Sequence, residues 1–187
     1  MMRGDGTLRS LAHELRLYLG DDGFLAPIKP EDVTDLYVTG LNDPDVNRFL
    51  TGPRKETQTM DTVRAFVAED EVSDVAILFG LFVEGVLRGT IRLHDVGASS
   101  AFIGLAFFDK RIWGRGWAKR AILRVCAFAF DEVGIDHIFA GVHDANEGSK
   151  RAFEWVGFRP IEGKVDDEGR AYTVWSLHHV NLRQAPR

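Results

Sequence analysis

The stretch from Phe107 to Arg120 constrains the fold of this chain most, because an apolar run ends there, two glycines follow, and a helical pattern begins at once. Apolar residues in that pattern recur at spacings that place them on one face of an α-helix. These residues are Ala118, Ala121, Ile122, Val125, Cys126 and Ala129. A strand, a glycine loop and a helix in this order predict a phosphate site, since helix N–H groups and the helix dipole favour anions. The spacing alone is equally compatible with a simple turn beside a solvated basic face.

Basic residues are concentrated in the same stretch, although the whole chain of 187 residues carries a formal net charge of −5 at pH 7. Between Asp109 and Arg124 six cations stand against one acid, and they are Lys110, Arg111, Arg115, Lys119, Arg120 and Arg124. An acidic protein as a whole is repelled by nucleic acid and by anionic membranes. The local basic cluster therefore predicts one small anionic ligand, with no nucleic acid and no membrane as partner.

Other features exclude further classes of protein. The lone cysteine, Cys126, cannot form an internal disulfide, and on the apolar helix face it is expected to be a small buried residue. The longest near-unbroken apolar run, Val75 to Val83, has nine residues, about half of a membrane-spanning helix. Charges interrupt the apolar stretch at the N-terminus, so we expect no secretory signal and a cytoplasmic location. The pair His178 and His179 lacks other spaced ligands, so we expect no metal site.

Hydrophobic periodicity and turn residues predict an α+β fold with a central sheet covered by helices. We expect an N-terminal hairpin at 15–19 and 24–28, a meander at 75–83, 86–93 and 101–107, and later strands at 138–142 and 172–177. We expect helices at 30–41, 61–70, 118–129 and 149–156, the last ended by Gly157. No linker or internal repeat divides the chain, so residues 1–187 are expected to form a single domain with its core at about 15–177.

The glycine loop lacks the spacing of a P-loop, and it has Lys119 where a Rossmann fingerprint needs its third glycine. The segment Trp113 to Ala118 instead resembles the acetyl-CoA loop of the GCN5-related N-acetyltransferases, Gln/Arg-x-x-Gly-x-Gly/Ala, with tryptophan in the Gln/Arg place. That tryptophan is typical of the branch that includes the ribosomal-protein N-terminal acetyltransferases. Val142 to Phe158 is similar to the family's junction of fifth strand and fourth helix, and Leu41 to Leu50 to the end of its first helix.

The resemblance implies a GNAT-like fold, with a mixed, mostly antiparallel sheet whose fourth and fifth strands splay apart, here 101–107 and 138–142. It implies transfer of an acetyl group from acetyl-CoA to a primary amine by direct attack. Pantetheine would pair with backbone from Leu105 to Phe107 and with Asn146. The pyrophosphate would be wrapped by the loop from Arg111 to Ala118, whose implied cofactor-binding residues are Arg111, Trp113, Gly114, Arg115, Gly116, Trp117 and Ala118.

Two departures from the family pattern bear on catalysis. Phe102 stands at the place matched to a strand glutamate that acts through water as a base, and Phe153 at the place of a tyrosine acid. A lysine amine is only about 0.1% neutral near pH 7.4, whereas an α-amine is about a quarter neutral and needs little base. We therefore expect catalysis by positioning, with Ser149, or a water that it holds, assisting the departing thiolate. His143 and Asp144 are alternative proton acceptors.

Two kinds of acceptor amine are weakly basic enough to need little help from a base. They are the α-amine of a protein N-terminus and the amine of an amino sugar, which could be nucleotide-linked in the sense that the sugar carries a nucleotide. Trp155 and Trp175 are candidates to stack on a sugar, although core positions are the commoner use of such residues. The missing glutamate and tyrosine leave a catalytically idle acyl-CoA-binding protein as an alternative. The sequence is compatible with a monomer or a homodimer.

Overall fold

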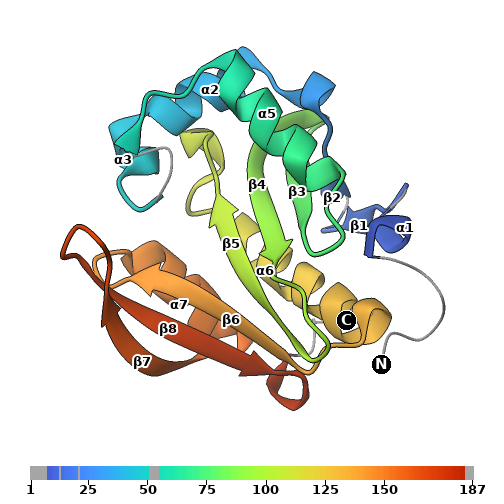
Figure 1. Ribbon diagram of the computed structural model, residues 1–187, viewed down its shortest axis with the longest axis vertical. Helices are drawn as coiled ribbons and strands as arrows, with labels where there is room; N and C mark the ends of the chain where they lie inside the picture. The colour runs from blue at the N-terminus through green and yellow to red at the C-terminus, as the bar shows by residue number, and fades with distance from the viewer. Residues whose placement is uncertain (1–7, 13, 21, 51–54, 184–187) are drawn as a thin grey trace.

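The computed structural model of the chain describes residues 8–12, 14–20, 22–50 and 55–183. Within these ranges eight strands form one sheet in the order β1-β2-β3-β4-β5-β6-β8-β7 (Figure 1). All neighbouring strands run antiparallel except β5 and β6, which are parallel. The strands are Leu17–Tyr18 (β1), Gly23–Pro27 (β2), Ile77–Val83 (β3), Val86–His94 (β4), Ser100–Ala106 (β5), His137–His143 (β6), Arg159–Val165 (β7) and Ala171–His178 (β8). The predicted α+β class and its mixed, mostly antiparallel sheet are confirmed.

Helices cover both faces of this sheet (Figure 1). The α-helices are Leu8–Ala12 (α1), Asp35–Asn42 (α2), Pro44–Asn47 (α3), Met60–Glu71 (α5), Trp117–Phe128 (α6) and Glu147–Val156 (α7). Residues of α2 and α5 share a buried cluster with Leu78 and Leu87 of the sheet, whereas α1, α6 and α7 pack into a second cluster on the other face. Short 3-10 turns lie at Pro30–Asp32, Lys110–Ile112 and His179–Asn181, and a π-helical turn at Ala129–Val133 continues α6.

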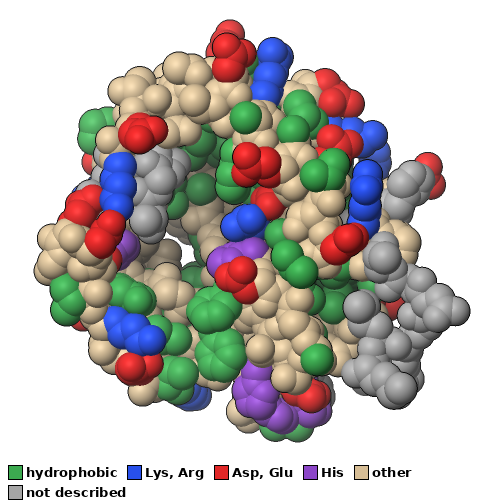
Figure 2. Space-filling view, viewed as in Figure 1, with side chains coloured by type: hydrophobic (Ala, Val, Ile, Leu, Met, Phe, Trp, Pro, Cys, Tyr) green, Lys and Arg blue, Asp and Glu red, His purple; other side chains and the backbone are tan. Residues whose placement is uncertain are grey.

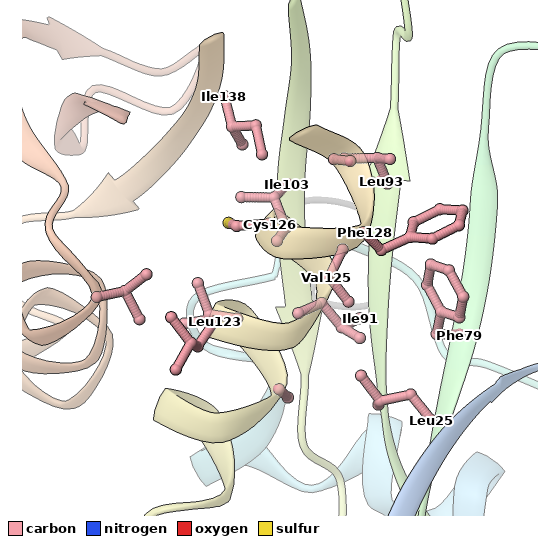
Figure 3. Close-up of a cluster of buried hydrophobic side chains, with 14 of the residues drawn as sticks. Leu25, Phe79, Ile91, Leu93, Ile103, Leu123, Val125, Cys126, Phe128 and Ile138 are labelled. Carbon is pink, nitrogen blue, oxygen red and sulfur yellow. The ribbon is translucent and has the colours of Figure 1, made fainter. Parts of the chain in front are cut away.

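The core forms where α6 lies along the sheet, as its apolar periodicity predicts. Figure 3 shows Val125, Cys126 and Phe128 of α6 among side chains that come from β3, β4 and β5, such as Phe79 and Ile91. Cys126 is completely buried, and this burial raises the pKa of its thiol. The only cysteine of the sequence is therefore a packing residue and no candidate nucleophile.

Several elements differ from the expected ones. The helix expected from residue 30 begins as a 3-10 turn and continues as α2 only after Thr34, whose side chain accepts a hydrogen bond from the Tyr37 N–H. The strand β7 was not predicted, because its seven residues are all exposed, include a proline, and show no apolar alternation. It forms because β8 offers backbone partners along its length. The short helices α1 and α3 were also missed.

The strands β5 and β6 part from each other, which confirms the splay expected for 101–107 and 138–142. Their parallel pairing covers only Ser100–Phe102 against His137–Phe139. Farther along, β5 pairs only with β4, as far as Ala106, and β6 pairs only with β8, as far as His143. In Figure 1 the two strands meet at one end and diverge toward the side on which α3 lies.

Candidate active site

A cavity of about 670 Å³ lies where β5 and β6 diverge. Four segments line it: residues 45–50 at and after α3, residues 103–107 at the end of β5, residues 112–119 of the glycine loop and α6, and residues 141–153 at the end of β6 and the start of α7. Figure 2 shows this face of the molecule hollowed between the part that carries α2 and α3 and the part that carries β6 and β8. The cavity thus lies at the break in the sheet.

The glycine loop has a backbone conformation that requires its glycines. Gly114 has φ +72° and Gly116 has φ +79°, in the left-handed region that other residues rarely adopt. No atom outside the adjacent residues lies within 4 Å of the Cβ position at either glycine, so the space beside the loop is open. Gly116 is also the N-cap of α6, whose first N–H groups lack partners within the helix. The loop therefore offers both room and donors for an anion.

Asp109 anchors the base of this loop. Its buried carboxylate accepts hydrogen bonds from Arg88, 2.5 Å away, from the Arg111 guanidinium at 2.9 Å and from the Arg111 backbone N–H at 3.0 Å. Burial alone would raise the pKa of Asp109, but the hydrogen bonds from the two arginines outweigh it and lower the pKa to about 2. The carboxylate is ionised at neutral pH and fixes the start of the 3-10 turn.

Three of the six cations in this stretch form hydrogen bonds or ion pairs within the protein. Lys110 contacts Asp43 at 2.6 Å and Asp45 at 3.1 Å. Arg111 is held by Asp109, and the Arg120 guanidinium donates to the Leu19 carbonyl at 2.9 Å and lies over the Trp117 ring. The predicted cofactor residues Arg111 and Arg115 are exposed and do not line the cavity. Lys119, which was not predicted as a site residue, does line it.

Trp113 ties the loop back to the strand that precedes it. Its indole N–H donates to the Phe107 carbonyl at 2.8 Å, and its ring is 41% exposed beside the cavity. The Phe107 carbonyl expected to pair with pantetheine is therefore already bonded to Trp113. The other cofactor-binding residues predicted from the sequence that line the cavity are Leu105, Phe107, Gly114, Gly116, Trp117, Ala118 and Asn146.

Asn146 and Ser149 stand together at the start of α7. The Asn146 side-chain oxygen accepts a hydrogen bond from the Ser149 N–H at 3.1 Å, which caps the helix and leaves the side-chain NH₂ group as a donor. Ser149 is half-buried and lines the cavity. Both residues can therefore reach a ligand in the cavity, one with an amide and one with a hydroxyl.

The side of the cavity opposite the glycine loop is built from segments distant in sequence. His143 lines it at the end of β6, and the ring centroids of Phe49 and Tyr172 lie 6.1 and 6.2 Å from the imidazole. Arg170, in the turn between β7 and β8, contacts His143 and also donates to the Arg48 carbonyl at 2.7 Å. We call the lining residues Arg48, Phe49 and His143, together with Arg170, which contacts two of them without lining the cavity, the acceptor wall. Its sequence signal was the resemblance of residues 41–50 to the family.

Other residues considered from the sequence lie elsewhere. Asp144 is exposed, accepts a hydrogen bond from Thr173 at 2.8 Å and does not line the cavity. Phe102 packs between His94 and Phe139 outside the cavity, and Gly104 lines it two residues farther on. Phe153 lines the cavity as an apolar ring. Within the described ranges, no group of three or more His, Cys, Asp or Glu residues could hold a metal ion, and no helix is both long and apolar enough to cross a bilayer.

A break between two parallel strands, with a glycine loop and a helix N-terminus beside it, is the coenzyme A-dependent acyltransferase site that the resemblance to the GCN5-related N-acetyltransferases implies. The chain belongs to the acetyltransferase (GNAT) domain family, which it matches over residues 24–159. It is 37% identical over 165 residues to "Probable N-acetyltransferase YjcK" of Bacillus subtilis (strain 168), a match that covers 82% of this chain and 90% of that protein. It is therefore an N-acetyltransferase of this family and uses acetyl-CoA.

Solved structures share the fold at low sequence identity. RimL, a ribosomal L7/L12 alpha-N-protein acetyltransferase solved in complex with coenzyme A, has a TM-score of 0.79 at 12% identity and covers 88% of this chain and 98% of its own. RimJ of Mycobacterium smegmatis, in complex with CoA-disulfide, has a TM-score of 0.72 at 21% identity and covers 87% of this chain and 85% of its own. The predicted likeness to the ribosomal-protein branch is thereby confirmed at the level of fold.

The residues at the cavity fit coenzyme A. The open space beside Gly114 and Gly116, the free N–H groups of α6 and the side chain of Lys119 suit a pyrophosphate. The side-chain NH₂ group of Asn146 suits an amide carbonyl of the kind that pantetheine carries.

Proposed function

We propose that this N-acetyltransferase acts on a weakly basic primary amine, namely the α-amine at the N-terminus of a polypeptide. One observation carries the proposal. Among the described residues that line the cavity, both carboxylates are ion-paired, Asp45 with Lys110 at 3.1 Å and Glu147 with Lys150 at 2.5 Å. No other lining carboxylate stands ready to take a proton from a strongly basic amine in the part of the chain that the structure describes.

An amine that is already neutral does not need that carboxylate. At pH 7.4 about a quarter of an α-amine is neutral, against about 0.1% of a lysine amine. Acetyl-CoA supplies the activated thioester, which the amine attacks directly. The residues of the chain position the two reactants, with Asn146 as a donor from the α7 cap and the glycine loop as the phosphate cradle. Ser149, or a water that it holds, would donate a proton to the departing thiolate.

An amino sugar, with or without a linked nucleotide, is the second acceptor that weak basicity allows. The aromatic residues considered for stacking on a sugar do not support it. Neither Trp155 nor Trp175 lines the cavity. Trp175 is buried in the core, and the Trp155 ring lies against the cationic groups of Lys119 and Arg183. The fold shared with an alpha-N-protein acetyltransferase supports the peptide acceptor.

Free-thiol release from acetyl-CoA with a panel of amines tests the proposal. The panel contains a peptide with a free N-terminus, the same peptide blocked at its N-terminus but carrying an internal lysine, glucosamine, and a nucleotide-linked amino sugar. We expect kcat/KM for the free N-terminus to exceed that for the lysine peptide by about 250-fold, following the neutral fractions. A preference for the lysine peptide or for a sugar overturns the proposed acceptor. If the protein binds coenzyme A but releases no thiol from acetyl-CoA with any of these amines, the catalytically idle acyl-CoA-binding protein becomes the supported alternative.

A further inference from the structure

The surroundings of His143 restrict what its ring can do. The side chain is only 13% exposed, lines the cavity and contacts the rings of Phe49 and Tyr172. The Nη2 atom of Arg170 lies 3.1 Å from Nε2 of His143, within hydrogen-bond distance, whereas the Oδ2 atom of Asp166 lies 3.9 Å from Nε2, beyond that distance. A guanidinium group donates hydrogen bonds and cannot accept them. Nε2 must therefore accept, and in the neutral ring the proton is on Nδ1.

Arg170 is itself held in place, so this choice of tautomer is built into the fold. Its Nε atom donates to Asp166 at 2.8 Å, and its Nη1 atom donates to the Arg48 carbonyl at 2.7 Å. Asp166 also accepts from the backbone N–H groups of Glu168 and Arg170. The backbone N–H and the guanidinium of Arg170 lower the pKa of Asp166 to about 2, which keeps the carboxylate charged. The guanidinium is thus fixed between three segments.

This geometry is unfavourable for His143 as a general base. The lone pair that could take a proton belongs to Nε2, and Arg170 already occupies it. The other ring nitrogen, Nδ1, carries a hydrogen and has no acceptor among the described residues. Because His143 lines the cavity, an Nδ1–H group without a partner among the described residues can recognise an oxygen atom on a substrate.

We propose that His143 donates its Nδ1–H to an oxygen of the acceptor, with Arg170 as the residue that positions and orients it. This inference rests on the proposed function and names the feature of the acceptor, besides its amine, that the cavity recognises. An oxygen two carbons away from the amine nitrogen is present in an α-amine, as the first carbonyl of the peptide, and in an amino sugar, as a neighbouring hydroxyl. It is absent from a lysine side chain and from simple alkylamines. The acceptor wall therefore selects amines with an oxygen in this relation.

Nitrogen-15 NMR of histidine-labelled protein tests the tautomer without any substrate. The sequence has six histidines, and the resonances of His143 are those lost in His143→Asn. We expect a protonated Nδ1 and an unprotonated Nε2 in the wild type, retained in Arg170→Lys and replaced by a mixture of tautomers in Arg170→Met. Lys164→Gln, in the same hairpin but away from the cavity, is the control and should leave the signal unchanged. A protonated Nε2 in the wild type overturns the proposal.

Kinetics with two small acceptors tests the recognition. Alaninamide carries the carbonyl oxygen, and isopropylamine has a methyl group in place of the carboxamide. We expect His143→Leu to lower kcat/KM for alaninamide about tenfold and to leave that for isopropylamine within twofold, the effect of one lost hydrogen bond. His143→Asn, whose amide can donate from near the Nδ1 position, should recover most of the loss. If His143 were a general base, both variants would instead lower kcat/KM equally, and they would do so for both amines.

Failure of the donor role can be distinguished from failure of the proposed function. Equal losses for the two acceptors in His143→Leu, or no recovery in His143→Asn, overturn the donor role while turnover itself continues. Absence of turnover with both acceptors in the wild type defeats the proposed function, and the donor role with it. Arg170→Met leaves the imidazole in place and gives a second measure of selectivity. A variant with the wild-type preference for alaninamide and mixed tautomers would contradict the positioning role of Arg170.

Discussion

The two sides of the cavity are built in different ways. On the cofactor side, two contacts of the glycine loop join residues close in sequence: Trp113 to Phe107, six residues apart, and Arg111 to Asp109, two apart. Asp109 also binds Arg88, 21 residues away. On the acceptor side, the contact that joins the last hairpin to the rest of the cavity spans 122 residues, from Arg170 to the Arg48 carbonyl. A local motif therefore organises much of the first side. The second exists only once the whole sheet and its last hairpin have formed.

Two charged pairs, one on each side, differ in exposure. Asp109 and Arg88, at the base of the cofactor loop, are 4% and 12% exposed. Lys55 and Asp167, which join the last hairpin to the region after α3, are 38% and 64% exposed. Removing one partner of a buried pair leaves the other charge buried and unpaired, which is destabilising, whereas an exposed pair contributes little to stability. Substitutions on the cofactor side should therefore affect folding or cofactor affinity, and those on the acceptor side should affect substrate choice.

The largest effect is expected from Asp109→Asn, which leaves Arg88 without its carboxylate. We expect a loss of about 3 kcal/mol in the free energy of unfolding at pH 7, measured by urea denaturation. The low pKa of Asp109 makes its contribution full above about pH 3.8, and it is lost as the pH falls through about 2. The difference from wild type should shrink over that range. Asp95→Asn, which changes an exposed carboxylate, is the control, and an equal loss there would contradict the argument from burial.

Gly116→Glu should weaken coenzyme A binding without unfolding the protein. The new carboxylate would lie at the N-terminus of α6 and repel the pyrophosphate, and we expect the Kd for coenzyme A to rise about a hundredfold by calorimetry. The positive φ contributes strain of about 1 kcal/mol. Gly85→Glu is a matched control, because Gly85 has φ +75° and open space but lies in the β3–β4 turn. An unchanged Kd in Gly116→Glu would remove the loop from the phosphate site.

Ser149→Ala tests whether a residue at the start of α7 affects catalysis without affecting cofactor binding. We expect kcat to fall about tenfold while the Kd for coenzyme A is unchanged, because only the departing thiolate loses its donor. The loss should diminish above about pH 8.5, where a thiolate leaves with little help. Ser73→Ala is the control, since Ser73 lies outside the cavity. An unchanged kcat in Ser149→Ala at pH 7 would exclude this role.

The fold could be predicted wherever a segment carries its own signal. The apolar face of α6, the meander of β3, β4 and β5, and the glycine at the end of α7 all follow from spacing within one element. The strand β7 could not be predicted in this way. Its seven residues are exposed, and only pairing with β8 makes them a strand. The π-helical turn after α6 likewise has no signal in the periodicity.

The site residues show the same difference between local and distant signals. Gly114, Gly116, Trp113, Asn146 and Ser149 were predicted from two local motifs, and all of them line the cavity. Charge alone was a poorer guide, because a count of cations does not show which of them already have partners. The acceptor wall was missed as a unit, since no spacing in the sequence joins Arg48 to Arg170. His143 was considered as an alternative proton acceptor, and no spacing in the sequence indicates that the Arg170 guanidinium lies 3.1 Å from its Nε2 atom.

The smallest effect is expected from Asp167→Asn on the acceptor side. It removes the exposed ion pair with Lys55, and we expect an unchanged unfolding temperature and an unchanged Kd for coenzyme A. The KM for the amine acceptor should rise about twofold, because the hairpin that carries Arg170 loses one of its links to the region after α3. Glu162→Gln removes a comparable pair on the same hairpin away from the cavity and should leave KM unchanged. If Asp167→Asn instead weakened coenzyme A binding as Gly116→Glu does, the two sides of the cavity would not be independent, and the division between cofactor affinity and substrate choice would fail.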